Sequence, residues 1–441
     1  MRQTAVFPVN ALPELKTRLL HWAQQFPVAM YLDSNGHADR HSEWECLVAA
    51  GAHDAVEKHA GSAFPALKDF WTARRDWCFG FLGYDLKNEL ETLASRHPDR
   101  TGFPDLYFFQ PRVVAGVRNG QLEVHSLDES PLAVYEALMQ RPVPPDSVSG
   151  APDFRPRMPK NEYLATVDAL RRHIIDGDVY EVNLCQEFFA EHADIDPAAV
   201  FARVNELARA PFSAFSRLGH RYLLCASPER FLKKKGDRLL TQPIKGTRRR
   251  GSSPNEDAQI RAELLSSEKD RAENVMIVDL VRNDLARHCL PGTVTAEELF
   301  GIYSFETVHQ MISTVSGRLR PDADGFEALR DAFPMGSMTG APKVMAMELI
   351  ERYEYSRRGL YSGAVGYMTP EGDFDFNVVI RSLFYNKMSR YLSVQVGGAI
   401  VYDSVPEEEY DECLVKAEAM LRYSASFPRP TSAPRDSTTN E

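Results

Sequence analysis

The stretch "TQPIKGTRRRG", residues 241 to 251, contains a lysine, Lys245, between an apolar run and a glycine. A strand interior usually excludes an ammonium group unless that group has a charged partner or a chemical role. The preceding residues, "RYLLCASPERFLKKKGDRLL", predict two strands joined by a tight turn. If the turn comprises residues 236 to 238, Glu229 lies directly opposite Lys245.

An acid and an amine on one face of a hairpin have two interpretations. As a cross-strand ion pair at a surface, they would contribute a few tenths of a kcal/mol to stability. As a reactive pair, they would supply a nucleophilic amine and a general acid. A two-residue turn would shift the register and separate them. Taken alone, the pattern favours the ion pair.

A second group of reactive residue types lies in "DSVPEEEYDECLVKAEAML", where Ser404 begins a predicted helix with a capping box. Glu409, Glu412 and Lys416 then share one helix face. Two carboxylates on one face can hold a hard cation such as Mg²⁺, and a solvated network of i, i+4 pairs is the common alternative. Glu273, at the edge of an apolar stretch, is a further carboxylate with either a ligand role or an arginine partner.

Composition restricts the class of protein around these residues. The chain has 441 residues, 44% of them hydrophobic and 26% charged, with a formal net charge of −11. The acidic balance argues against a nucleic-acid backbone as partner. Six cysteines occur without any C-x-x-C pair, which indicates reduced thiols rather than a zinc site or disulfides. No apolar run approaches the ~18 residues that span a membrane, so we expect a cytoplasmic protein.

Proline content and periodicity divide the chain. Six prolines between residues 141 and 160 predict a linker or long loop. We expect a helix from 161 that stops near Gly177, and helical structure over 256–288 with a break at Ser266 and Ser267. Strands predicted near 179–190 and over 360–401 occur in blocks rather than in strict alternation with helices. This arrangement favours an α+β fold with antiparallel sheets.

The order of several segments resembles the chorismate-utilising enzymes, which include anthranilate, aminodeoxychorismate, isochorismate and salicylate synthases. The segments are "SPERFL", "PIKGTRRRG", "KDRAENVMIVDLVRNDLAR", "STVSGRL", "GSMTGAPK", "YSGAVGYM", "VIRSL" and "EEEYDECLVKAEAML". The resemblance implies a large two-sheet antiparallel β core flanked by helices. It also implies an N-terminal region over 1–140 that contributes to this core, a catalytic region over 161–424, and a disordered tail over 425–441.

Within this family, anthranilate synthases usually have alanine where this sequence has Lys245, and aminodeoxychorismate synthases have lysine. The resemblance therefore implies amination of chorismate at C4, with Lys245 as a nucleophile at C2 and Glu229 as the general acid. For this mechanism, we expect a partly desolvated pocket to lower the pKa of Lys245. Isochorismate-forming relatives use a lysine at position 181 to activate water, and Glu181 argues against that chemistry.

The same resemblance assigns ligands to the remaining motif residues. Mg²⁺ would be held by Glu273 and Glu412, with Glu409 nearby or bound through water. The residues expected to bind substrate are Thr247, Tyr361, Arg381, Lys416 and the backbone of Gly397 and Gly398. One departure from the family pattern is Ala399, which replaces a common glycine and limits positive φ.

Two further expectations concern ligands and partners. No segment resembles a glutaminase, so we expect ammonia to come from a class I glutamine amidotransferase subunit or from solution. The sequence leaves open whether a pocket near Asp33 and Ser34 binds tryptophan, as in some relatives. Anthranilate synthase and a non-catalytic binding subunit remain the alternative functions.

Overall fold

A computed structural model describes residues 2–37, 39–142, 152–306 and 308–421 of the chain. The predicted tail over 425–441 lies outside these residues, as do residues 143–151 of the proline-rich stretch. The described part of that stretch contains a two-residue strand, β7 (Arg155–Pro156), and the first residue of α5 (Lys160–Ile175).

Twenty strands form one hydrogen-bonded network that divides into two sheets. The first sheet runs in the order β3, β2, β9, β10, β19, β20 and β8, with β7 and β16 also paired to β8. The second runs in the order β5, β4, β17, β18, β11, β12 and β15, with β13 and β14 also paired to β15. The long strands β3 and β5 pair with each other and join the two sheets, and β6 and β1 extend β5.

The first-sheet strands are β2 (Val28–Asp33), β3 (Cys46–Lys58), β8 (Glu181–Ala190), β9 (Phe212–Leu218), β10 (Arg221–Ser227), β16 (Gly340–Ala341), β19 (Ser382–Asn386) and β20 (Tyr391–Ile400). The second-sheet strands are β4 (Cys78–Leu82), β5 (Leu106–Arg118), β11 (Arg230–Lys235), β12 (Arg238–Gln242), β13 (Ile244–Arg249), β14 (Thr295–Ser304), β15 (Val308–Arg318), β17 (Ala364–Met368) and β18 (Phe374–Val378). The outer pair is β1 (Gln3–Pro8) and β6 (Gln121–Ser126).

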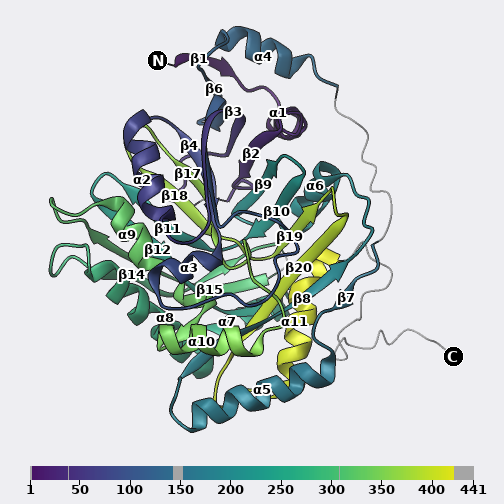
Figure 1. Cartoon of the computed structure of the whole chain (residues 1–441), viewed down its shortest axis with the longest axis vertical. Helices are drawn as coiled ribbons and strands as arrows, with labels where there is room; N and C mark the ends of the chain where they lie inside the picture. The colour runs from purple at the N-terminus through teal and green to yellow at the C-terminus, as the bar shows by residue number, and fades with distance from the viewer. Residues whose placement is uncertain (1, 38, 143–151, 307, 422–441) are drawn as a thin grey trace.

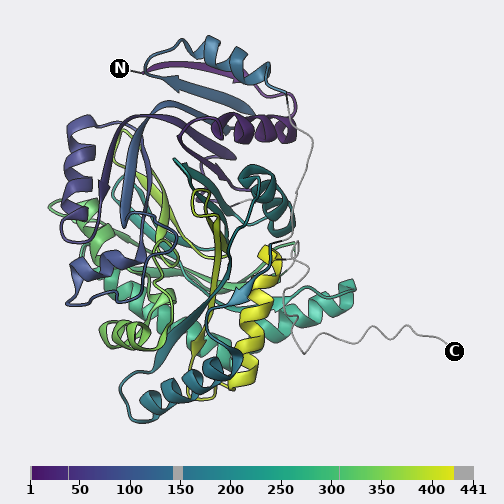
Figure 2. The same ribbon diagram turned by 45° about the vertical axis from the view of Figure 1, so that its right-hand side comes forward.

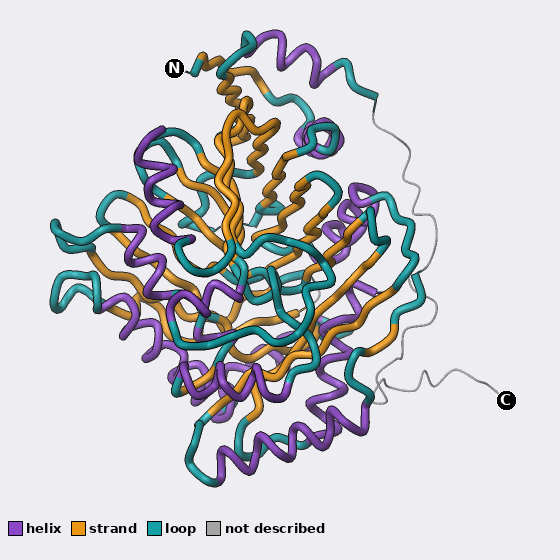
Figure 3. The backbone as a smooth tube through the Cα atoms, viewed as in Figure 1, coloured by secondary structure: helices purple, strands orange, loops and turns teal. Residues whose placement is uncertain are grey.

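Helices surround the strands, as Figure 3 shows in purple around orange. They are α1 (Leu12–Ala23), α2 (Ala63–Arg74), α3 (Lys87–Leu90), α4 (Pro131–Met139), α5, α6 (Pro197–Ala208), α7 (Pro254–Ser266), α8 (Glu268–Ala286), α9 (Gly325–Ala332), α10 (Lys343–Tyr353) and α11 (Pro406–Leu421). Two short 3₁₀ helices cover Tyr84–Leu86 and Gly336–Met338. Figure 1 places β1, β6 and α4 at one end of the molecule, with α5, α7, α8 and α10 toward the other.

Two hydrophobic cores hold these layers together. One packs a face of the first sheet against α1, α5, α6, α10 and α11. The other joins facing residues of both sheets and continues under α2, α8 and α9. Strand β8 is buried along its whole length because helices or strands cover both of its faces. In Figure 2, α11 stands in yellow beside the strands of the first sheet, where it packs on β20. The expected α+β fold with an antiparallel two-sheet core is confirmed.

Local signals account for several element boundaries. Helix α5 ends at Ile175, and Gly177 adopts a left-handed φ of 86°, as the sequence predicted. The predicted helical break occurs between α7 and α8, where the Ser267 hydroxyl accepts a hydrogen bond from the Asp270 N–H (3.3 Å). The start of α11 differs from the predicted capping box, because the Ser404 hydroxyl donates to the side chain of Glu409.

The predicted register of the β11–β12 hairpin is wrong. Lys235 pairs with Arg238, so the turn contains two residues rather than three, and a bulge follows between Arg230 and Lys233. Glu229 therefore does not lie opposite Lys245. The described part of the chain contains no helix long and apolar enough to cross a membrane.

The same hairpin buries an arginine that makes a testable contribution to stability. The Arg230 guanidinium is fully buried, lies 2.7 Å from Asp39 and 2.9 Å from Asp375, and packs 4.7 Å from the Phe212 ring centroid. Arg230→Met leaves both carboxylates without this cation, and we expect it to lower the free energy of unfolding by about 3–5 kcal/mol. Urea denaturation measures the change.

A matched control is Arg238→Met on the adjacent strand, where the guanidinium is 40% exposed beside Glu297. An exposed pair contributes at most about 1 kcal/mol. Equal losses in the two variants would contradict the distinction between the buried and exposed arginines.

Candidate active site

A cavity of about 630 Å³ opens between β13, β20, α8 and α11. All the predicted site residues except Gly398 line it: Glu229, Lys245, Thr247, Glu273, Tyr361, Arg381, Gly397, Glu409, Glu412 and Lys416. Gly398 follows Gly397 on β20. Residues separated by as many as 187 positions in the sequence are thus gathered around one space, large enough for a small-molecule ligand.

Lys245 on β13 is buried in the wall of this cavity, and its partner is Glu181 rather than Glu229. The Nζ atom donates to Glu181 Oε1 on β8 (2.5 Å). Burial disfavours the charged ammonium, but Glu181 and Glu273 outweigh that effect and raise the pKa of Lys245 above its ordinary value. The sequence-based expectation of a lowered pKa is therefore wrong. Lys245 rests as a protonated amine.

Glu229 lies between β10 and β11 and is 6% exposed. Its Oε1 accepts a hydrogen bond from the Ser337 hydroxyl (2.7 Å). Burial raises the pKa of Glu229 to about 7, although Ser337, Lys245 and Arg381 partly offset the effect. A carboxyl group with this pKa holds its proton in part of the molecules at neutral pH, which suits a general acid.

Helix α11 supplies the predicted carboxylate face. Lys416 Nζ lies 2.6 Å from Glu412 Oε1 and donates to the Gly397 carbonyl (2.7 Å), so the i, i+4 alternative is present within the site. Burial raises the pKa of Glu409 to about 7, and Lys416 lowers the pKa of Glu412. A Cβ at Gly398 would lie 3.2 Å from Glu409 Oε2 and 3.5 Å from Glu412 Oε1. The missing side chain gives both carboxylates room.

These groups fit a magnesium ion only in part. No set of three or more His, Cys, Asp or Glu side chains in the described residues is close enough to hold a metal by itself. However, Glu409 and Glu412 converge over Gly398, and Glu273 lines the same cavity from α8. Lys269 acts electrostatically on all three carboxylates. Because Mg²⁺ uses few protein carboxylates and completes its shell with water and ligand oxygens, the donor set is compatible with it.

Arg381 adds a cation to the wall of the cavity. It follows β18 with a left-handed φ of 49°, and its guanidinium forms no hydrogen bond or ion pair with another described residue. Burial lowers the pKa of Arg381 to about 10, so the group stays charged at neutral pH. Tyr361 is buried close by in the wall, and its hydroxyl contacts Cys185 Sγ (3.6 Å). Ala399 lies in β20 without a positive φ, so alanine causes no backbone strain there.

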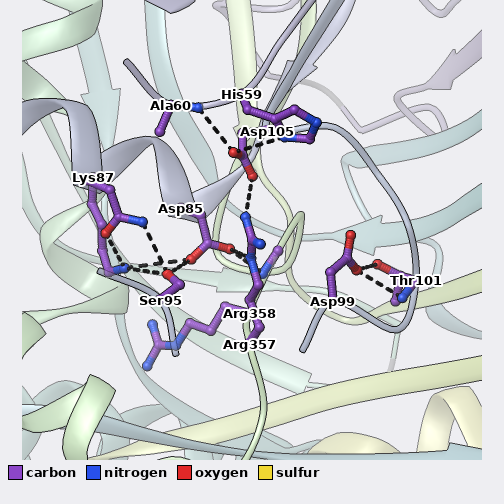
Figure 4. A network of polar contacts seen from close by, with 12 residues as sticks. His59, Ala60, Asp85, Lys87, Ser95, Asp99, Thr101, Asp105, Arg357 and Arg358 are labelled. Atoms are coloured by element: carbon purple, nitrogen blue, oxygen red, sulfur yellow. Dashed lines mark hydrogen bonds and ion pairs between the residues drawn. The ribbon is translucent and has the colours of Figure 1, made fainter. Parts of the chain in front are cut away.

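A buried polar network braces the loop that carries Tyr361 (Figure 4). Arg357 Nε donates to Asp85 (2.8 Å), and Arg357 Nη2 donates to Asp105 (2.7 Å). Arg358 donates to the carbonyls of Met338 and Asn183 (2.6 and 2.9 Å). Asp85 and Asp105 belong to the N-terminal third of the chain, so that region helps to position the cavity wall.

The contacts of two residues of the site, Glu181 and Ser337, were not predicted from the sequence. Glu181 was considered only as the residue that replaces a lysine, and its contact with Lys245 joins positions 64 residues apart. Ser337 lies in the "GSMTGAPK" segment without an assigned role, yet it binds Glu229. No local pattern predicts either contact, because each joins residues that only the tertiary fold brings together.

The pocket near Asp33 and Ser34 is small. Its volume is about 60 Å³, room for about two water molecules, and Trp44 is part of its wall. The Asp33 carboxylate accepts hydrogen bonds from Lys16 (2.7 Å) and Tyr31 (2.8 Å). Both of its oxygens therefore already have hydrogen-bond partners within the chain.

Comparison with known proteins identifies the family. A model of the chorismate binding enzyme family matches residues 16–422, and the chain belongs to this family. It is 37% identical over 351 residues to aminodeoxychorismate synthase component 1 of Klebsiella aerogenes, covering 79% of this chain and 77% of that protein. It is 36% identical over 354 residues to anthranilate synthase component 1 of Thermus thermophilus, covering 78% and 76%.

A longer relative and a solved structure extend the comparison. The chloroplastic aminodeoxychorismate synthase of Arabidopsis thaliana is 37% identical over 404 residues, which cover 86% of this chain and 44% of the relative. The chain therefore spans about half the length of that protein. The crystal structure of anthranilate synthase component I from Streptococcus pneumoniae superposes with a TM-score of 0.77 at 26% identity, covering 88% of this chain and 94% of that one.

The small pocket predicts that tryptophan does not bind between the sheets. Because an indole ring needs far more space than two water molecules, we expect millimolar tryptophan to leave the melting temperature unchanged. Differential scanning fluorimetry checks this, with phenylalanine as the matched amino acid. A concentration-dependent rise with tryptophan alone would contradict the prediction.

Proposed function

We propose that the chain aminates chorismate at C4 and forms 4-amino-4-deoxychorismate, the reaction expected of an aminodeoxychorismate synthase. The observation that carries the proposal is a buried amine, Lys245, in the same cavity as Glu229, a carboxyl group whose pKa is raised to about 7. Similarity to the Klebsiella and Arabidopsis proteins supports it.

In the proposed first step, the neutral Lys245 amine attacks C2 of the ring, the double bond shifts, and the C4–O bond breaks. Glu229 gives its proton to the departing hydroxyl, which leaves as water. In the second step, ammonia attacks C4 and the C2–N bond to Lys245 breaks. Two displacements bring the new amine to C4, whereas direct attack of ammonia at C2 leads to the anthranilate-type product.

Other residues of the cavity would hold the substrate. Chorismate carries two carboxylates, and the guanidinium of Arg381, which has no hydrogen-bond or ion-pair partner among the residues that the structure describes, is suited to one of them. Tyr361, Thr247, Lys416 and the backbone of Gly397 would complete the contacts. Mg²⁺, held by Glu273 and Glu412 with Glu409 nearby, would bind the ring carboxylate and act as a Lewis acid.

The source of ammonia is proposed to be a separate class I glutamine amidotransferase. A glutaminase of that kind uses a cysteine thiolate with a lowered pKa. All six cysteines of the chain are free and buried, and burial raises the pKa of each thiol, for example to about 11 at Cys225. The word "component" in the names of similar proteins supports a partner subunit.

Anthranilate synthesis is the second candidate. The Thermus relative with that name is nearly as similar as the aminodeoxychorismate synthases. Lys245 favours C4 amination, because the anthranilate-forming branch usually has alanine at this position. A non-catalytic chorismate-binding subunit is a third hypothesis. The presence of Lys245 and of all the expected carboxylates disfavours it.

Product analysis tests the proposal directly. The purified chain is incubated with chorismate, Mg²⁺ and ammonium salt, and we expect 4-amino-4-deoxychorismate by liquid chromatography with mass spectrometry. Lys245→Ala removes the nucleophile and should lower kcat on the order of 10³-fold. Any residual product should shift toward anthranilate, since ammonia then attacks C2 directly.

Lys233→Ala is the matched control, because Lys233 is a buried lysine of the neighbouring hairpin that pairs with Glu43 and lies outside the cavity. Anthranilate from the unaltered chain would contradict C4 amination, and an unchanged rate in Lys245→Ala would remove the nucleophile role. No turnover of chorismate would favour a binding subunit.

A pH profile tests the role of Glu229. A general acid works only when protonated, so kcat/KM for chorismate should fall as pH rises through about 7, the raised pKa of Glu229. Glu229→Gln should lower kcat/KM by about 100-fold or more and remove this fall. The profile is measured at saturating Mg²⁺ and constant free ammonia. A rate that rises through neutral pH in the unaltered chain would exclude Glu229 as the acid.

A further inference from the structure

The resting state of Lys245 conflicts with its proposed reactivity. A nucleophilic amine needs a free electron pair, yet Lys245 is held as an ammonium ion by Glu181 Oε1 at 2.5 Å. One proton must therefore leave Nζ before or during attack on C2. The question is which group receives it.

Glu181 has the geometry of that receiver. It is fully buried on β8, and it is not among the residues that line the cavity. Its second oxygen, Oε2, is buried and forms no hydrogen bond within the described chain. A buried carboxylate with an unpartnered oxygen is costly as an anion.

The other charged groups that act on Lys245 form no ion pair with it. They are Glu273 on α8, Glu412 and Lys416 on α11, and Glu229 between β10 and β11. Glu412 is paired with Lys416 (2.6 Å), and Glu229 is bound by Ser337 (2.7 Å). Glu273 forms no ion pair with Lys245 within 4.0 Å. Glu181 is thus the only carboxylate of the described residues in direct contact with the amine.

We propose, on the basis of the function above, that Glu181 is the positioning residue of Lys245, which aims the amine into the cavity and accepts its proton as the amine attacks. The proton moves from Nζ to the Glu181 carboxylate, the freed electron pair forms the N–C2 bond, and the C4–O electrons leave with the proton of Glu229 as water. The adduct nitrogen is then a secondary ammonium ion. The cavity keeps its net charge, because Glu181 becomes neutral while Glu229 becomes a carboxylate.

The second displacement restores both groups. Ammonia forms the C4–N bond, and the electrons of the C2–N bond return to Lys245 as a neutral amine. Glu181 then gives its proton back to Nζ, and Glu229 recovers a proton from the ammonium formed at C4. Atoms and protons balance over the cycle as chorismate and ammonia giving the amino product and water.

Covalent adduct formation measures this role. The full chain is mixed with chorismate and Mg²⁺ without ammonia at a series of pH values, and the reaction is quenched rapidly. Mass spectrometry of the intact protein then measures the amount of adduct. The adduct has the mass of the chain plus chorismate less one water. Glu181→Gln should slow adduct formation by about 100-fold, and kcat with ammonium salt by the same factor. The KM for chorismate should stay within about threefold, because the variant leaves the cavity-lining groups in place.

Two features separate proton acceptance from simple positioning. In Glu181→Gln the rate should rise with pH, because solvent hydroxide must now take the proton. In Glu181→Ala, added formate should restore the rate, since this small carboxylate can occupy the vacated space and accept the proton. Glu181→Asp keeps the charge and should recover part of the activity even if the neutral variants melt early. Glu187→Gln, which removes another buried carboxylate from β8, is the matched control and should react normally.

Adduct formation at the unaltered rate in Glu181→Gln overturns the proposal. A slowed rate with an unchanged pH profile and no rescue by formate overturns the proton-accepting role. If the unaltered chain forms neither adduct nor aminated product, the proposed function fails instead, and the two failures are distinguished.

Discussion

The ammonium group of Lys245 is removed from water inside a β core, and the rest of the cavity is arranged around that charge. Moving an ion of this kind from water into a protein costs several kcal/mol unless an opposite charge compensates it. Glu181 supplies that charge from the first sheet, while Lys245 belongs to the second. The ion pair therefore links the two sheets at the point where the cavity forms.

The other cations of the cavity wall differ in whether they have a partner within the chain. Lys416 is paired with Glu412 on its own helix, so it adds no net charge to the wall. Arg381 differs, because within the described residues its guanidinium is aimed at the cavity without a partner. Lys269 also lines the cavity and forms no ion pair within the described residues, so two cations of the wall are available to an anionic ligand.

Local patterns were sufficient for the parts of the site that depend on one element. The helical repeat of Glu409, Glu412 and Lys416 placed three groups on one face, because the period of a helix is fixed. The hairpin failed since the register depends on one residue in the turn and on a bulge that no residue type announces. The Glu181 contact was inaccessible for a different reason: it depends on β8 reaching β13 across the space between the sheets.

Motif order supplied what periodicity did not. The family resemblance placed Glu229 and Lys245 in one site even though the register argument was wrong, because it depends on the whole fold. It could not supply the protonation state of Lys245. That state is a property of the immediate surroundings, and the neighbouring carboxylates Glu181 and Glu273 reverse the expected shift of the pKa.

The pairing of distant strands has a consequence for how the molecule forms. Strand β4 pairs with β17, β2 with β9, and β8 with β20, so most of the core joins segments far apart in the sequence. Such nonlocal topologies fold slowly, because long loops must close before their contacts stabilise anything. During synthesis β4 and β8 each lack one of their partner strands until β17 and β20 emerge. The carboxylate helix α11 emerges after them, so the growing chain depends on protection from aggregation until synthesis is nearly complete.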